Sequence, residues 1–110
     1  MKSKVVTREE ALSRIHDGQT IMFEDWHGEF AADEIIDGML EKGIKDIDAI
    51  AVSAGMADQG VGKLIKDHRV KSLITTHIGW NPIAKDQMFA RELAIEFSPQ
   101  GTFAERIRCG

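Results

Sequence analysis

Residues 47–75 read IDAIAVSAGMADQGVGKLIKDHRVKSLIT and contain a complete strand–helix–strand pattern. The apolar run Ile47–Val52 predicts a strand, and a glycine-containing loop follows it. Residues 61–67 indicate a short helix, and residues 70–75, rich in β-branched side chains, predict the next strand. Two strands joined through a helix are expected to run parallel, and the crossover between them is expected to be right-handed. This stretch therefore predicts one α/β unit.

The alternation of predicted strands and helices continues on both sides of that unit. Residues 20–23 predict a short buried strand, and residues 93–97 predict a fourth strand. Helices are expected between Thr7, which opens a capping box, and Gly18, around residues 35–40 before Gly43, from Pro82 onward, and over residues 102–108. The whole chain thus predicts an α/β fold with an open, mostly parallel sheet flanked by helices, forming one domain over residues 1–110.

Composition narrows the function classes. The chain has 110 residues, 43% hydrophobic and 29% charged, which is ordinary for a globular domain. The net charge of −4 lacks the basic surplus typical of nucleic-acid binders, so no nucleic-acid partner is expected. No apolar stretch approaches the length of a membrane span, and the start lacks a signal-peptide pattern. Cys109 is the single cysteine, which excludes an internal disulfide and fits a cytoplasmic protein.

Polar side chains gather in the loops that follow the predicted strands. These loops are residues 24–32, 53–60, 77–82 and 98–101. Ligands of open parallel sheets bind beyond the carboxyl ends of the strands, so a site is expected there. Trp26 and Trp80 fall in these loops, where an aromatic wall for a ligand and local packing are both open interpretations.

Common catalytic and metal motifs do not account for these residues. The stretch Gly60–Lys63 resembles a phosphate-binding P-loop only superficially, because Ala57 and Leu64 stand where that motif needs glycine and Ser or Thr. The residues Glu24, Asp25, His27 and His77 could meet at adjacent strand ends, but their spacing matches no metal motif. We therefore expect no bound metal.

One segment is far more specific. Residues 98–110 read SPQGTFAERIRCG, which closely resembles the S/T-P-Q-G-T-L-x-E-x-I-R-x-G segment of family I CoA-transferase alpha subunits. Residues 60–65 are similar to that family's G-x-G-x-L-I stretch, and residues 70–82 to its V-K-K-x-I-x-S-H-I-G-x-N-P stretch. Residues 17–22 and 36–47 also fit without gaps. The resemblance spans the chain, which corresponds to the N-terminal half of such a subunit.

The resemblance implies a reaction and a partner. In this family, CoA moves between a short-chain acyl-CoA (acetyl-, butyryl- or acetoacetyl-CoA) and a free carboxylic acid. A glutamate on a separate beta subunit is the nucleophile, and coenzyme A is a substrate, not a permanently bound cofactor. The alpha subunit contributes a glutamine, matched here by Gln100, whose amide would support the developing oxyanion. Capping of the next helix by Gln100 is the alternative.

The family's CoA-binding loop, G-G-F-x-x-x-G-x-P, differs strongly here. The matching candidates for CoA contacts are Glu24, Asp25, Trp26, His27, Gly28, Glu29 and Phe30, together with Ser53 in the next loop. Carboxylates in place of the leading glycines would repel the phosphates of CoA. A remodelled subunit without catalysis, or with altered specificity, is therefore an alternative. A third is an unrelated α/β binder in which Glu24, Asp25 and His27 hold a sugar or a metal.

Family alpha subunits continue beyond the position that matches Gly110. We therefore expect this chain to correspond to a fragment or a truncated product. A sheet that ended there would have an unpaired edge, which a partner would need to cover.

Overall fold

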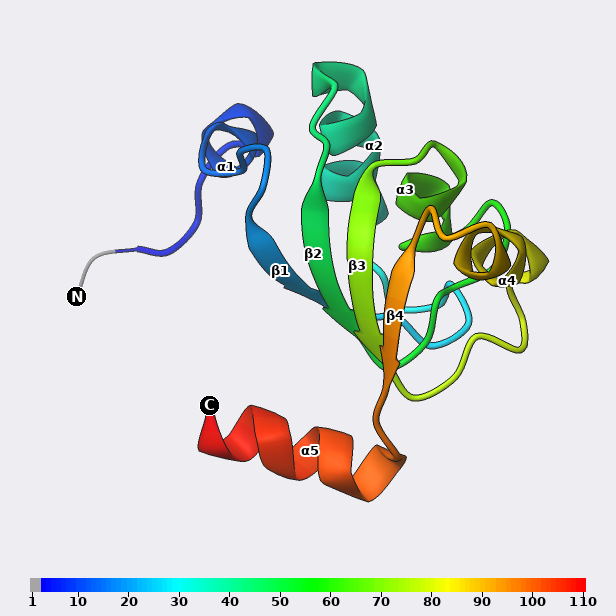
Figure 1. Ribbon diagram of the computed structural model, residues 1–110. Coiled ribbons are helices and arrows are strands. Elements are labelled where there is room, and N and C mark those ends of the chain that lie inside the picture. Colours follow the sequence, from blue (N-terminus) through cyan, green and yellow to red (C-terminus); the bar gives the residue numbers. More distant parts are fainter. Residues whose placement is uncertain (1–2) are drawn as a thin grey trace.

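The computed structural model describes residues 3–110 (Figure 1). Helices and strands alternate along the chain in the order α1 (Arg8–Ser13), β1 (Thr20–Phe23), α2 (Asp33–Lys42), β2 (Ile47–Ala51), α3 (Gly62–Lys66), β3 (Val70–Thr75), α4 (Pro82–Phe89), β4 (Ala94–Phe97) and α5 (Gln100–Cys109). The predicted α/β class is confirmed.

The strands form one four-stranded sheet in the order β1-β2-β3-β4, and every neighbouring pair is parallel. Strand order therefore follows chain order. Right-handed crossovers that always advance in one direction place their helices on the same face of a sheet. Figure 1 shows this arrangement, with α2, α3 and α4 together on one side. All four carboxyl ends consequently lie along one edge.

The core lies between the sheet and these three helices. Ile47, Ala49 and Ala51 of β2 alternate toward the helices, as does Leu73 of β3, and all four are almost fully buried. Opposite them, α2 and α3 contribute buried apolar side chains, among them Ile36, Met39, Leu64 and Ile65. The side chains that support the site are therefore held by a close-packed layer.

The opposite face of the sheet is covered only in part, by α5. Met22, Ile50 and Ile74 line an apolar hollow of about 360 Å³ together with Phe103 and Ile107 of α5. Met22 remains 54% exposed, so the prediction that residues 20–23 form a buried strand is wrong. The physical reason is that β1 is an edge strand whose outer face lies away from α2, α3 and α4.

Local signals in the sequence set most helix ends. The Thr7 side chain accepts a hydrogen bond from the Glu10 backbone nitrogen, and Gly43 ends α2 in the left-handed conformation at φ 72°. Asn81 caps α4 ahead of Pro82. The last helix was expected from residue 102, but α5 begins at Gln100, so Gln100 belongs to its first turn. Within residues 3–110, no helix combines the length and apolarity needed to cross a bilayer.

Candidate functional site

The loops after the four strands meet at the carboxyl edge of the sheet. Pairing between β2 and β3 continues past their ends through a bridge between Ser53 and His77. The Thr76 backbone nitrogen donates to the Val52 carbonyl oxygen over 3.2 Å, and the Ser98 nitrogen donates to the Thr75 oxygen over 2.9 Å. These bonds hold the loops against one another, so the predicted meeting of strand-end residues is confirmed.

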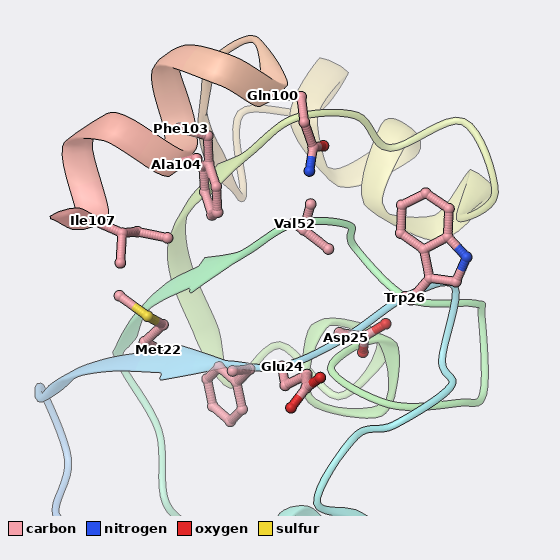
Figure 2. Close-up of a pocket in the computed structure, with 10 residues that line it drawn as sticks. Met22, Glu24, Asp25, Trp26, Val52, Gln100, Phe103, Ala104 and Ile107 are labelled. Atoms are coloured by element: carbon pink, nitrogen blue, oxygen red, sulfur yellow. The ribbon is translucent and has the colours of Figure 1, made fainter.

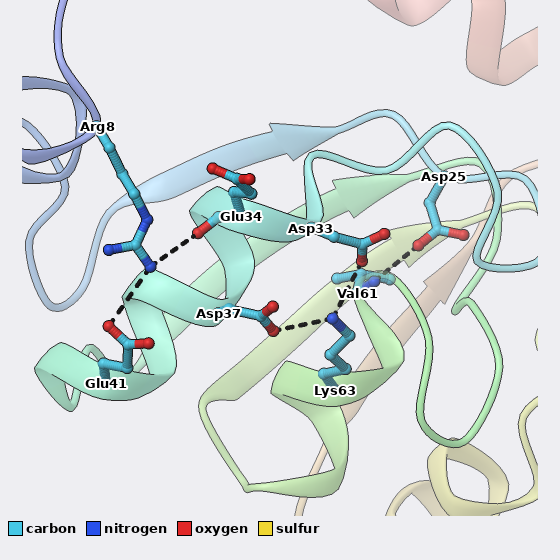
Figure 3. Close-up of polar contacts among 8 residues, drawn as sticks. All are labelled: Arg8, Asp25, Asp33, Glu34, Asp37, Glu41, Val61 and Lys63. Carbon is cyan, nitrogen blue, oxygen red and sulfur yellow. Dashed lines mark hydrogen bonds and ion pairs between the residues drawn. The ribbon is translucent and has the colours of Figure 1, made fainter.

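Asp25 is the structural centre of this edge. Its side chain is only 1% exposed, although it follows an exposed neighbour, Glu24. One carboxylate oxygen accepts from the Gly28 nitrogen (2.7 Å) and from the Ser53 hydroxyl (3.2 Å). The other oxygen accepts from the Val61 nitrogen (2.7 Å; Figure 3). A buried carboxylate satisfied by three donors stabilises the loops that it joins.

Ser53, in the loop after β2, belongs to the same hydrogen-bond network. Its hydroxyl oxygen accepts from the backbone nitrogens of His27 (3.0 Å) and Gly55 (3.2 Å). Asp25 and Ser53 were both predicted to contact CoA, and that role stays a prediction. Both are almost fully buried, although Asp25 is among the residues that line the Gln100 pocket described below. Glu24 is the exposed member of the acidic pair.

The backbone between these contacts is unusual. His27 and Phe30 have φ values of 54° and 60°, and Gly28 between them has φ 88°. Left-handed values cost energy for a residue with a side chain. Phe30 occupies the position where the similar family loop has glycine, so the loop retains a glycine-type backbone here. Its ring is 75% exposed and is not part of the core.

Gln100 faces a pocket of about 390 Å³ at this edge (Figure 2). Its amide points toward Val52, with Trp26 on one side and Phe103 on the other. Glu24 also lines the pocket. Pro99, not Gln100, occupies the N-cap position of α5, so the alternative in which Gln100 caps the helix does not describe this structure.

Four rings form a cluster beside that pocket. The His27 ring is central, with centroid distances of 4.5 Å to Trp26, 5.0 Å to His77 and 5.1 Å to Trp80. Burial lowers the pKa of His77, and the neighbouring His27 lowers it further. Trp26 and Trp80 remain 47% and 60% exposed, so their indoles form an accessible surface as well as packing on the imidazoles.

The basic stretch from Lys63 to Lys71 is largely paired with carboxylates. Lys63 contacts Asp37 at 2.9 Å and Asp33 at 3.2 Å (Figure 3), and the hydrogen bond to Asp37 is the main cause that raises its pKa. Arg69 pairs with Asp67 at 2.8 Å. Within the described part of the chain, no group of three or more His, Cys, Asp or Glu side chains could hold a metal ion.

Some contributors to this edge carried no clear signal in the sequence. The Val61 backbone nitrogen is one, since any residue type except proline could supply it. Gly60 is another: a Cβ atom there would overlap the Asp25 carboxylate. Asn81 was predicted among the polar strand-end residues, but it is fully buried and donates to the Ala54 carbonyl oxygen (2.9 Å). It organises the backbone of the 53–60 loop.

Comparison with known proteins agrees with this architecture. The family model for coenzyme A transferases matches residues 5–110. A probable coenzyme A transferase subunit alpha of Bacillus subtilis is 42% identical over 107 residues, covering 97% of this chain and 47% of the relative. The acetate CoA-transferase subunit alpha of Escherichia coli is 37% identical over 110 residues, covering 100% of this chain and 50% of the relative.

A further relative is the acetoacetyl-CoA:acetate/butyrate CoA transferase alpha subunit of Clostridium acetobutylicum, which is 38% identical over 110 residues. The match covers 100% of this chain and 50% of that relative. This chain therefore spans about half the length of the curated relatives it matches. The resemblance seen in residues 98–110 thus extends across the parallel sheet and the loops at its edge, and the chain belongs to the coenzyme A transferase family.

Proposed function

We propose that this chain forms the N-terminal part of a CoA-transferase alpha subunit. The subunit would help to move CoA between a short-chain acyl-CoA, such as acetyl-, butyryl- or acetoacetyl-CoA, and a free carboxylic acid. The observation that carries this proposal is the placement of Gln100, whose amide enters a pocket at the carboxyl edge of the parallel sheet. The names of the alpha-subunit relatives support the same reaction class.

The nucleophile in this proposal is a glutamate of a partner beta subunit. Its carboxylate attacks the thioester carbonyl, and the bond from carbon to sulfur breaks to give an acyl anhydride and the CoA thiolate. The thiolate then attacks the glutamyl carbonyl, which releases the first acid and leaves a glutamyl thioester. The second acid reverses both steps. Each addition places negative charge on a carbonyl oxygen, which the Gln100 amide N–H would stabilise in this proposal.

The decisive experiment pairs an alpha subunit that contains this sequence with its beta subunit. Acetyl-CoA and isotopically labelled butyrate or acetoacetate are supplied, and formation of the labelled acyl-CoA is measured. The proposal expects label in the new thioester and release of acetate. An assembled pair that binds CoA but gives no exchange would contradict it. The exposed thiol of Cys109 fits a reducing compartment, so we place this activity in the cytoplasm.

Glu24 favours a second candidate function. Its exposed carboxylate lines the Gln100 pocket, where the similar family loop has glycine. A subunit that kept the scaffold but lost CoA binding, or changed its acid substrate, would show this pattern. It would assemble with the beta subunit yet fail in the exchange reaction with acetate and butyrate, and its binding of other carboxylic acids would then identify the altered specificity.

A further inference from the structure

Another pocket lies next to the Trp26–His27 ring pair, and Gln100 is not among its lining residues. It has a volume of about 240 Å³ and is lined by His27, Glu29, Met56, Gln59 and Trp80. The Gln100 pocket includes Trp26, whose ring centroid is 4.5 Å from that of His27. The two pockets therefore share a wall made of these two rings, and the second one has no role in the proposed oxyanion chemistry.

The lining of this second pocket suits a positively charged group. An indole face attracts a cation through its quadrupole, and recognition of ammonium groups by aromatic walls is a recurrent use of this interaction. Trp80 provides such a face at 60% exposure, and Glu29 adds an exposed carboxylate. Met56 contributes a polarizable thioether. Among residues 3–110, this lining includes no Lys or Arg that would repel a cation.

Hydrogen bonds hold the residues that line this pocket in place. His27 holds its ring against Trp80 at 5.1 Å from a left-handed backbone with φ 54°, a conformation that costs energy unless surrounding contacts enforce it. The Ser53 hydroxyl enforces it by accepting from the His27 nitrogen. Glu29 is fixed by two backbone hydrogen bonds with Trp26, of 2.9 and 3.1 Å. The buried Nδ1 of His27 has no hydrogen-bond partner among the described residues.

We propose that this pocket binds an alkylammonium group. If the proposed transferase function holds, the ligand of this pocket is the ammonium or quaternary ammonium substituent of a carboxylic acid or acyl substrate. A CoA phosphate is a poor occupant, because the Glu29 carboxylate would repel it. A neutral flat ring could contact the indole but would leave that carboxylate without a charge partner.

The chain offers a direct optical test. It contains two tryptophans, Trp26 and Trp80, and both belong to the ring cluster, so intrinsic fluorescence reports on this corner alone. The full chain is titrated with choline and, separately, with its uncharged isostere in which carbon replaces nitrogen. We expect a saturable change in tryptophan emission with choline and no saturable change with the isostere. Equal responses to both compounds would overturn the assignment of a cation site.

Variants locate the binding. Affinity for choline is measured by NMR from the backbone amide shifts of His27 and Gln59. We expect Trp80→Ala and Glu29→Gln each to weaken it by about fivefold or more. The matched controls are Phe89→Ala, an exposed ring outside the pocket, and Glu34→Gln, an exposed carboxylate on α2. Wild-type affinity in both pocket variants would refute the site, as would equal weakening in the controls.

The outcome is separable from that of the proposed function. Exchange of CoA among acetate and butyrate tests the transferase and does not need the ammonium pocket. Binding of choline to the chain tests the pocket and does not need the beta subunit. If both hold, an ammonium-bearing acid should be accepted in the exchange assay, and Glu29→Gln should raise the KM for that acid by a larger factor than the KM for butyrate.

Discussion

The carboxylate of Asp25 lies 2.7 Å from the backbone nitrogen of Val61, a residue 36 positions away in the chain. The same side chain binds the Gly28 nitrogen in its own loop, also over 2.7 Å. One buried acid therefore joins the loop after β1 to the loop after β2. This contact therefore helps to set the shape of the site edge.

Asp25→Ala should destabilise the chain by about 2–4 kcal/mol, because buried backbone donors lose a charged acceptor. The measurement is the free energy of unfolding from urea titration followed by circular dichroism. Asp58→Ala is the matched control, since Asp58 is an exposed acid in the neighbouring loop, and it should change stability by less than about 0.5 kcal/mol. Equal losses in the two variants would refute the structural role of Asp25.

Gly60→Ala should also be strongly destabilising. Gly60 has φ 59°, and an added Cβ would overlap the Asp25 carboxylate. We expect a loss of more than about 2 kcal/mol in the free energy of unfolding. Gly101→Ala provides the contrast, because a Cβ there would meet open space among the described residues, and helix propensity would gain up to about 0.5 kcal/mol. A harmless Gly60→Ala would show that the loop packs less tightly.

Glu24→Gly tests phosphate repulsion at the Gln100 pocket. Removing the exposed carboxylate should tighten CoA binding by the assembled transferase, measured by calorimetry, and more so at low ionic strength. Glu24→Gln separates charge from size, since it removes only the charge. Asp58→Ala, which removes an exposed carboxylate of the neighbouring loop, should give no such gain, because Asp58 does not line this pocket. Unchanged CoA affinity in both Glu24 variants would show that the Glu24 carboxylate does not repel the CoA phosphates.

Gln100→Ala tests the oxyanion role within the proposed function. Loss of one donor of this kind typically lowers kcat by about 100-fold or more, with a smaller effect on KM. Thr102→Ala, an exposed change in the same helix, is the control for damage to α5. Assembly with the beta subunit should survive in both variants, as checked by size-exclusion chromatography. A normal kcat for Gln100→Ala would exclude the amide from the reaction.

Acid should destabilise the chain through His77. The folded state holds the pKa of His77 below its ordinary value of 6.5, so the unfolded chain binds a proton that the folded chain does not. The free energy of unfolding should therefore decrease as the pH falls below about 6.5. His77→Gln should flatten this part of the pH profile, and an unchanged profile in that variant would contradict the assignment to His77. An NMR titration of the His77 ring measures the pKa itself.

Much of the fold could be predicted because it depends on local patterns. Apolar runs with glycine-containing loops located each strand, and their alternation with helices predicted the parallel sheet. Burial of residues 20–23 could not be predicted this way. A short apolar run looks alike at the centre and at the edge of a sheet, and only the tertiary arrangement places Met22 outside the core.

The candidate site shows where such reasoning fails. Gln100 lies in a segment of high similarity and lines a pocket at the carboxyl edge of the sheet, whereas its role in the reaction stays a prediction. The adjacent acids Glu24 and Asp25 look equivalent in the sequence, yet one is exposed and the other is almost fully buried. The difference arises from donors contributed by distant residues such as Val61, which no local pattern reveals.

The close packing of Gly60 on Asp25 restricts how the sequence of this loop can diverge during evolution. Replacing Asp25 by a small residue would leave a gap and remove the acceptor of three hydrogen-bond donors until a second position changed. A lineage that first enlarged Gly60 would meet a steric barrier. Substitutions at positions 25 and 60 should therefore be correlated among related sequences.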